Sequence, residues 1–187
     1  MGQERAWRVA TRISVWVVAV LFATLLATGI VLTFRYRPTV SYADVGALER
    51  HPVFTARHVH RLASSLFLPA TLCLLVSSAG LFRTRRERAP IAWPVIAVGL
   101  SLFAAFTGYL LPWDQLGLWA VTVGTNMQGY RPILRGHGVK FVLLGTNEVS
   151  PATISHWYWV HAVAVPLLLV TVVVVVVVRA RRQPTRV

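Results

Sequence analysis

Acidic residues are scarce in this chain of 187 residues, where six Asp and Glu stand against 19 Lys and Arg. None of the six carboxylates lies within a long apolar run. Proton relays and cation transporters normally place an acidic side chain at mid-membrane, so the scarcity argues against both classes. The sequence also lacks a Walker loop, a Ser-His-Asp set and a zinc-binding spacing, so none of these motifs indicates a function.

Cysteine and lysine are each present only once, as Cys73 and Lys140. A single cysteine excludes an intramolecular disulfide and any CxxC-type metal or haem attachment. Cys73 lies in the middle of an apolar run, where we expect a small buried core residue. The positive charge is almost all arginine, placed beside apolar runs and not on one basic face, so the expected partner is a membrane and not nucleic acid.

Long apolar runs dominate the rest of the sequence, which has a mean hydropathy of +0.61. The four runs are 21 or 22 residues long and cover residues 13–34, 62–82, 91–111 and 157–178. At about 1.5 Å per residue, each can cross a hydrocarbon layer of about 30 Å as a helix, and backbone groups in lipid require that helix. The first run is too long for the apolar part of a signal peptide. We therefore expect an all-α, integral membrane four-helix bundle that forms one domain over residues 1–187.

Arginine density predicts how the bundle is oriented in the membrane. Residues 1–12, 83–90 and 179–187 hold 11 Lys and Arg in 29 positions, whereas residues 35–61 and 112–156 hold 8 in 72. The denser side is normally cytoplasmic. We therefore expect the chain to lie in the inner (plasma) membrane of the cell. Both termini would be cytoplasmic, and the loop 112–156 would lie on the outer face.

The outer-face loop is too long to be a simple connection. The sequence predicts that Pro112 ends the third helix and that a short interfacial helix covers residues 118–127. A glycine-rich turn is expected at residues 136–138, and a helix start at Pro151 leads into the last apolar run.

Two of the six histidines, His60 and His161, lie at the outer ends of the second and fourth expected helices. Gly29 and Gly108 lie at about the same level on the other two helices. Two facing imidazoles can supply both axial bonds of a haem, and glycines let the ring edges approach the backbone. The alternative is that each imidazole is buried and hydrogen-bonds a neighbouring carbonyl.

Arg57 and Arg61 lie beside His60, near the outer edge of the expected ring. Arginine pairs bidentately with carboxylates, so both are candidates to bind haem propionates. The alternative is that they extend to lipid headgroups. The remaining histidines lie in loops or at interfaces and are not assigned to this site. They are His51, His58, His137 and His156.

Five segments of the chain, in order and at compatible spacing, resemble the N-terminal half of the cytochrome b family. The form that they resemble is the short split one known from plastid and cyanobacterial quinol-oxidising complexes. The segments are residues 27–40, 57–61, 108–115, 119–126 and 153–166. The resemblance implies that His60 and His161 are axial ligands and that Gly29 and Gly108 pack against a haem.

The second haem site of the family is altered in this sequence. Relatives hold that haem with a histidine four turns further along the second and fourth helices, where this chain has Leu74 and Val176. The glycines that would accompany them are replaced by Val15 and Pro94. The resemblance therefore implies one haem b and not two, and no redox chain across the bilayer within this subunit.

The resemblance also implies a function, that of a single-haem b-type membrane cytochrome. It would be the electron-transfer subunit of a respiratory oxidoreductase, exchanging electrons between quinol or quinone and an outer-face redox partner. Whether it is itself a complete enzyme stays open. A haem-free membrane anchor for an outer-face redox enzyme is the alternative.

Partner subunits and a quinone site follow from the same resemblance. In relatives the outer quinone pocket is built partly by residues that match Phe106, Ala120, Val123 and Gly124. The rest comes from a loop that this chain lacks. Either a second membrane subunit supplies it or the quinone binds elsewhere, for example in the space of the absent haem. Expected partners in a hetero-oligomer are a Rieske protein, a cytochrome c, a molybdenum protein or a subunit-IV-like protein.

Overall fold

The structure is a computed structural model that describes residues 2–49, 55–85, 91–126, 144 and 148–182. No strand occurs in this described part of the chain. In chain order its elements are α1 (Gly2–Thr33), the 3₁₀ helix η1 (Pro38–Val40), α2 (Ser41–Glu49), α3 (Ala56–Arg85), α4 (Ala92–Leu110), α5 (Gln115–Asn126), α7 (Pro151–Trp159), the π-helical segment η3 (Val160–Ala164) and α8 (Val165–Arg182).

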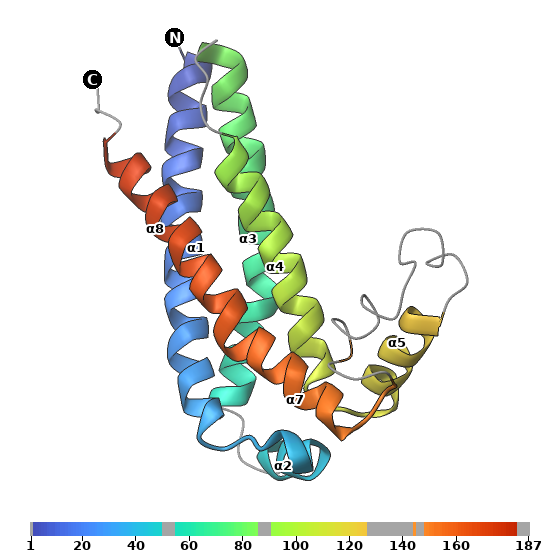
Figure 1. Ribbon diagram of the computed structural model, residues 1–187. Helices are drawn as coiled ribbons and strands as arrows, with labels where there is room; N and C mark the ends of the chain where they lie inside the picture. Colours follow the sequence, from blue (N-terminus) through green and yellow to red (C-terminus); the bar gives the residue numbers. More distant parts are fainter. Residues whose placement is uncertain (1, 50–54, 86–90, 127–143, 145–147, 183–187) are drawn as a thin grey trace.

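Four of these helical stretches are long and apolar enough to cross a membrane: α1, α3, α4 and the continuous rod α7–η3–α8. They lie side by side as a bundle (Figure 1), which confirms the expected all-α architecture of an integral, multi-pass membrane protein. Three of the four helices extend well beyond the apolar runs, because the flanking Arg, Gln and Ala residues also favour helix. The predicted C-terminal ends of the first and third membrane helices are each one residue too late, because α1 ends at Thr33 and α4 ends at Leu110.

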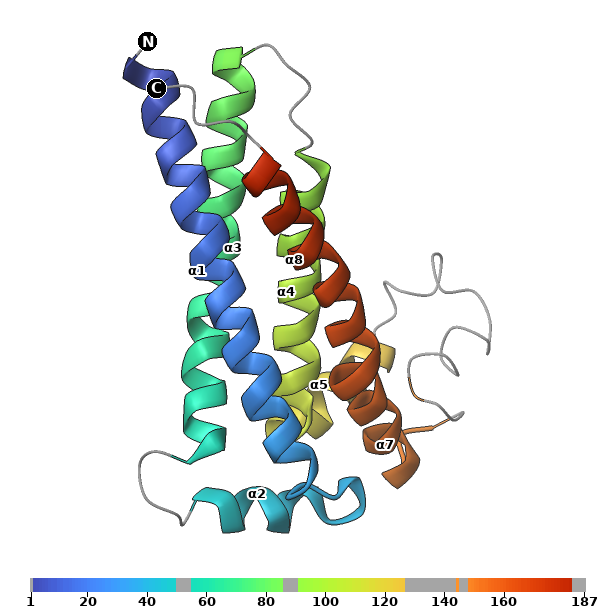
Figure 2. The same ribbon diagram turned by 90° about the vertical axis from the view of Figure 1, so that its left-hand side faces the viewer.

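The two ends of the bundle differ in what they carry (Figures 1 and 2). At one end, here called the terminus end, α1 and α4 begin and α3 and α8 finish. At the other, here called the loop end, lie α2, α5 and α7. The residues that the sequence analysis assigned to a haem or quinone site all lie toward the loop end.

The short helices at the loop end refine the sequence prediction. The expected interfacial helix is α5, which begins three residues early because Asp114 caps it. The Asp114 carboxylate accepts from the Gly117 amide at 2.9 Å, and its carbonyl accepts from the Leu118 amide at 2.9 Å. Helix α7 begins at Pro151 as predicted. The expected turn at residues 136–138 lies outside the described residues.

The core between the long helices is aliphatic apart from the stacked rings of Phe22 and Phe67, and it occupies the middle of the bundle. The expectation that Cys73 is buried is wrong, because its side chain is exposed on α3 while its neighbour Leu74 faces inward. Lipid is as apolar as the core, so depth in the membrane does not tell which face of a helix points inward. One buried polar contact crosses the core, between the hydroxyls of Thr71 and Ser101 at 3.0 Å.

Tryptophans and arginines fasten the terminus end. The guanidinium of Arg179 lies 5.6 Å from the Trp93 ring and that of Arg181 lies 5.2 Å from the Trp16 ring, at cation–π range. On α3, Gly80 has no side chain where the ring of Trp7 from α1 packs. The two arginine–tryptophan contacts hold α8 against α4 and α1, and the Trp7 contact holds α1 against α3.

A helix that the sequence did not predict, α2, is joined by an ion pair to Arg37, in the connection that follows α1. The carboxylate of Asp44 accepts from the Arg37 guanidinium at 2.8 and 3.1 Å and from the Arg37 amide at 2.8 Å. The hydrogen bond from Arg37 holds the pKa of Asp44 below its usual value. Nearby, the Tyr36 hydroxyl donates to the Leu111 carbonyl at 2.6 Å, and burial raises its pKa well above the usual value, so it stays protonated.

Replacing Asp44 by asparagine is expected to loosen η1 and α2, because the amide cannot pair with the Arg37 cation. Hydrogen exchange of residues 38–47, followed by mass spectrometry at pH 7, should become faster than in the unaltered protein. Because the pKa of Asp44 is lowered in the folded state, its stabilisation is complete above the ordinary value of about 3.9. It is lost only as the pH falls further, through the lowered pKa.

The matched control is Glu4→Gln, which removes the Arg8–Glu4 pair of α1 (2.6 Å) at the opposite end of the bundle. It should leave exchange in residues 38–47 unchanged. Identical exchange in Asp44→Asn and the unaltered protein would show that the ion pair does not hold α2.

Candidate functional site

His60 and His161 face each other at the loop end of the bundle. His60 projects from the first turns of α3, and His161 from η3. Their ring centroids are 6.4 Å apart and the ring planes are inclined by 71°. Two residues separated by 101 positions in the chain are therefore brought within contact of each other by helices that run in the same direction.

A glycine lies against each of these imidazoles. A Cβ atom on Gly29 of α1 would lie 3.4 Å from Cε1 of His60, and one on Gly108 of α4 would lie 2.8 Å from Cε1 of His161. The second distance is too short for real atoms, so Gly108 cannot gain a side chain unless His161 moves. Both glycines thus lie against the histidine rings, at the level expected from their positions along the helices.

A threonine precedes each glycine and reaches the same histidine. The hydroxyl oxygen of Thr28 lies 2.9 Å from Nδ1 of His60, and that of Thr107 lies 2.9 Å from Nδ1 of His161. In each Thr-Gly pair, therefore, the threonine hydroxyl lies at hydrogen-bond distance from the histidine, and the glycine, which has no side chain, lets the imidazole ring lie against the helix backbone. Sequence reasoning missed the threonines, although the repeated Thr-Gly dipeptide was a signal that could have indicated them.

His161 lies in a π-helical segment, in which the Val165 amide donates to the carbonyl five residues back, Val160. A π turn contains one residue more than an α turn. Val176 lies fifteen residues after His161, whereas Leu74 lies fourteen after His60. The extra residue in η3 accounts for the longer spacing, and it lets both pairs stand about four turns apart.

The two candidate arginines differ in their surroundings. Arg57 lies one turn before His60 on α3 and is half-buried, whereas Arg61 is exposed. Both are on the loop-end side of the histidine or level with it. Both arginines thus flank His60 along α3, and Arg57 is the more enclosed of the two.

Of the four candidate quinone-pocket residues, two come together and two do not. The Phe106 ring meets the Trp157 ring edge-on, with centroids 5.9 Å apart, and Ala120 packs against the cluster that contains Trp157. Val123 is 49% exposed, and a Cβ atom on Gly124 would meet nothing within 4 Å. Both lie further along α5 and outside that cluster.

Trp157 is a residue that sequence reasoning missed. Its side chain is only 6% exposed, yet its indole Nε1 has no hydrogen-bond partner among the described residues. A buried donor without an acceptor is costly and rare. Its position four residues before His161, on the same face of an α-helix, was the available signal.

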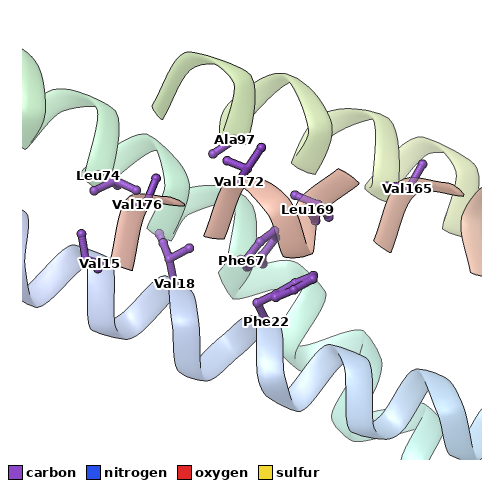
Figure 3. Packing of buried hydrophobic residues seen from close by; sticks show 11 residues of the cluster. Val15, Val18, Phe22, Phe67, Leu74, Ala97, Val165, Leu169, Val172 and Val176 are labelled. Atoms are coloured by element: carbon purple, nitrogen blue, oxygen red, sulfur yellow. The ribbon is translucent and has the colours of Figure 1, made fainter. Parts of the chain in front are cut away.

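The inner positions that would hold a second haem are packed with side chains (Figure 3). Val15 and Leu74 are 2% and 1% exposed, and Val176 belongs to the same cluster. Pro94 of α4 is buried as well. The expectation that a quinone could use the space of the absent haem is therefore wrong, because aliphatic side chains fill that space.

Comparison with known proteins bears on the identity of the chain. The profile of the family described as Cytochrome b/b6/petB matches residues 8–183. Cytochrome b6 of Tupiella akineta is 33% identical to this chain over 153 residues, which cover 78% of this chain and 70% of that protein. The match includes all four long helices and both histidines of the site. On this evidence the chain belongs to the cytochrome b/b6 family.

Proposed function

We propose that this chain is a single-haem b-type cytochrome, with His60 and His161 as the axial ligands of the haem iron. The observation that carries the proposal is the pair of facing imidazoles, each opposed by a glycine on another helix. In the part of the chain that the structure describes, no group of three or more His, Cys, Asp or Glu could hold a metal ion. Two imidazoles suit a metal whose other bonds come from a macrocycle.

The residues around the histidines fit a haem in this position. Each histidine has Nδ1 at hydrogen-bond distance from a threonine, so Nε2 is the nitrogen left for iron. Gly29 and Gly108 would leave room for ring edges. An added Cβ at Gly108 would crowd His161, whereas one at Gly29 would make an ordinary contact with His60. When bound, a haem supplies a one-electron redox centre.

Arg57 and Arg61 are proposed to bind the haem propionates. Guanidinium groups pair with carboxylates in two parallel hydrogen bonds, and both arginines flank His60 on the first turns of α3. Their positive charge near the iron would favour the reduced state. Arg57, which is half-buried, is the stronger candidate.

One haem and not two is proposed because the inner level is a packed core. Val15, Leu74 and Val176 are buried together there, and none can ligate iron. Fourteen residues of helix span about 21 Å, so no second redox centre within this chain would connect the site to the terminus end. Electron exchange would stay at the loop end.

The proposed role is that of an electron-transfer subunit of a respiratory oxidoreductase, a hetero-oligomer in the inner (plasma) membrane. The similarity to a cytochrome b6 supports a place in such a complex. With both termini cytoplasmic and residues 1–187 forming one domain, the loop end would face outward. There it would meet a Rieske, cytochrome c or molybdenum protein and a subunit-IV-like membrane partner.

We place the quinol or quinone beside Trp157, with Phe106 and Ala120 as further contacts. An unmade hydrogen bond of a buried donor costs about 1–3 kcal/mol, and a quinone oxygen would satisfy the indole N–H. Phe103, whose ring centroid lies 6.3 Å from that of Trp157, and Phe106 are partly exposed and border the cluster on the outside of the bundle. Val123 and Gly124 would contribute only through a partner subunit.

A reduced-minus-oxidised spectrum and a haem-to-protein ratio test the haem proposal. The purified protein should show a b-type band and one haem per chain. His60→Ala and His161→Ala should each abolish the band, because one axial ligand does not hold the haem in this site. His156→Ala is the control, since its ring lies beside Trp157.

Two haems per chain, or a band that survives in both histidine variants, would contradict the assignment. A colourless protein that still copurifies with an outer-face redox enzyme would instead support the haem-free anchor.

Gly108→Ala is expected to lower haem content several-fold, because the added Cβ would lie 2.8 Å from the His161 ring. Gly29→Ala should have a smaller effect, since its Cβ would lie 3.4 Å from His60. Gly99→Ala on the same helix as Gly108 meets nothing within 4 Å and should bind haem normally. Equal haem content in all three variants, measured by pyridine haemochrome, would refute the role of the glycines.

Trp157→Phe tests the quinone position by removing the indole N–H while keeping an aromatic ring. With a short-chain quinol as the electron donor to the purified complex, we expect KM to rise about 2- to 10-fold, the equivalent of one neutral hydrogen bond. Trp159→Phe, at an exposed position two residues further along, should leave KM unchanged. An unchanged KM in Trp157→Phe would exclude the indole as a quinone contact.

A further inference from the structure

Thr28 on α1 and Thr107 on α4 occupy equivalent positions relative to the two histidines, although the two helices are far apart in the chain. Each lies one residue before the glycine that opposes a histidine, and each is 2.9 Å from Nδ1 of that histidine. Thr107 is fully buried and Thr28 is half-buried. Both contacts cross between helices, from α1 to α3 and from α4 to η3.

The direction of each hydrogen bond follows from where the hydroxyl proton goes. A threonine hydroxyl has one proton to donate. The Thr28 hydroxyl donates it to the carbonyl of Thr24 at 2.7 Å, and the Thr107 hydroxyl donates to the carbonyl of Ala104 at 3.1 Å. With its proton directed there, each oxygen accepts from the histidine, whose ring also hydrogen-bonds a backbone carbonyl, that of Leu25 for His60 and that of Ala104 for His161.

An accepting oxygen requires a proton on the ring nitrogen that faces it. Nδ1 of His60 and Nδ1 of His161 must therefore carry their N–H, which leaves the lone pair of a neutral imidazole on Nε2. The same arrangement occurs on both histidines, so both are held in the same tautomer and in a fixed ring orientation. That tautomer is the one in which Nε2 can bind iron.

We propose that Thr28 and Thr107 are positioning residues that set the tautomer of His60 and His161 and tune the redox potential of the haem between them. The inference rests on the proposed bis-histidine haem. A hydrogen bond from Nδ1–H to an acceptor makes the ligating nitrogen more basic, which favours the oxidised iron. Removal of the threonine oxygen leaves each ring with its backbone carbonyl as the remaining acceptor and should therefore raise the midpoint potential.

The test is a redox titration of the haem-loaded, full-length protein in membranes, with Thr28→Val and Thr107→Val made singly and together. Valine keeps the shape and removes the oxygen. Each single variant is expected to show a positive shift equivalent to about a two- to tenfold change in the ratio of oxidised to reduced haem at fixed potential. The double variant should shift further, and Thr28→Ser and Thr107→Ser should restore the original value.

Thr71→Val is the matched control for a purely structural effect. It removes another buried hydroxyl that bonds between helices, the one that meets Ser101 of α4 at 3.0 Å, but away from the histidines. It should lower thermal stability as much as the other valine variants do, without moving the potential. The electron paramagnetic resonance signal of the low-spin ferric haem should also change only in the Thr28 and Thr107 variants, because it reports the orientation of the axial imidazole rings.

The outcomes separate this inference from the proposed function. If the unaltered protein has no haem, the bis-histidine assignment fails. If haem is bound and the potential and the resonance signal are the same in Thr28→Val, Thr107→Val and the unaltered protein, the threonines do not tune the site, while the histidine assignment stands.

Discussion

The absence of water in the hydrocarbon core is the constraint from which this structure follows. Backbone groups there can bond only within a helix, and polar side chains must find partners on the same or a neighbouring helix. His60 meets Thr28, His161 meets Thr107, and Thr71 meets Ser101. The first two contacts pair α1 with α3 and α4 with η3 at one level, so the same requirement that satisfies the histidines also sets how the helices approach.

The two ends of the bundle use this constraint differently. At the loop end, glycines make room, hydroxyls hold imidazoles, and a buried indole N–H has no acceptor among the described residues. Toward the terminus end, the corresponding level is an aliphatic core that contains Val15, Leu74 and Val176, followed by contacts between arginines and tryptophans. One end is suited to hold a ligand and the other to hold the helices together. A redox centre confined to the loop end is consistent with this division.

Sequence reasoning succeeded where a property depends on position along the chain. Apolar length predicted four membrane helices, and the depths of His60, His161, Gly29 and Gly108 predicted that they share a level. It failed for α2, because that helix depends on the ion pair between Arg37 and Asp44, and for Cys73, which faces outward. It did not distinguish Phe106, whose ring contacts Trp157, from Val123, which is half exposed on α5.

By itself, then, the sequence determined the fold class, the number of long helices and the depth of each candidate ligand, because helical rise converts residue number into height. Only the tertiary structure decided which side chains face each other at that height. It brought the Thr28 hydroxyl to Nδ1 of His60, filled the inner level with aliphatic side chains and left the indole of Trp157 without an acceptor among the residues that the structure describes. The physical reason is that lipid and protein core are equally apolar. The rotation of a membrane helix about its axis is therefore set by contacts between helices and not by a pattern of hydrophobicity along the chain.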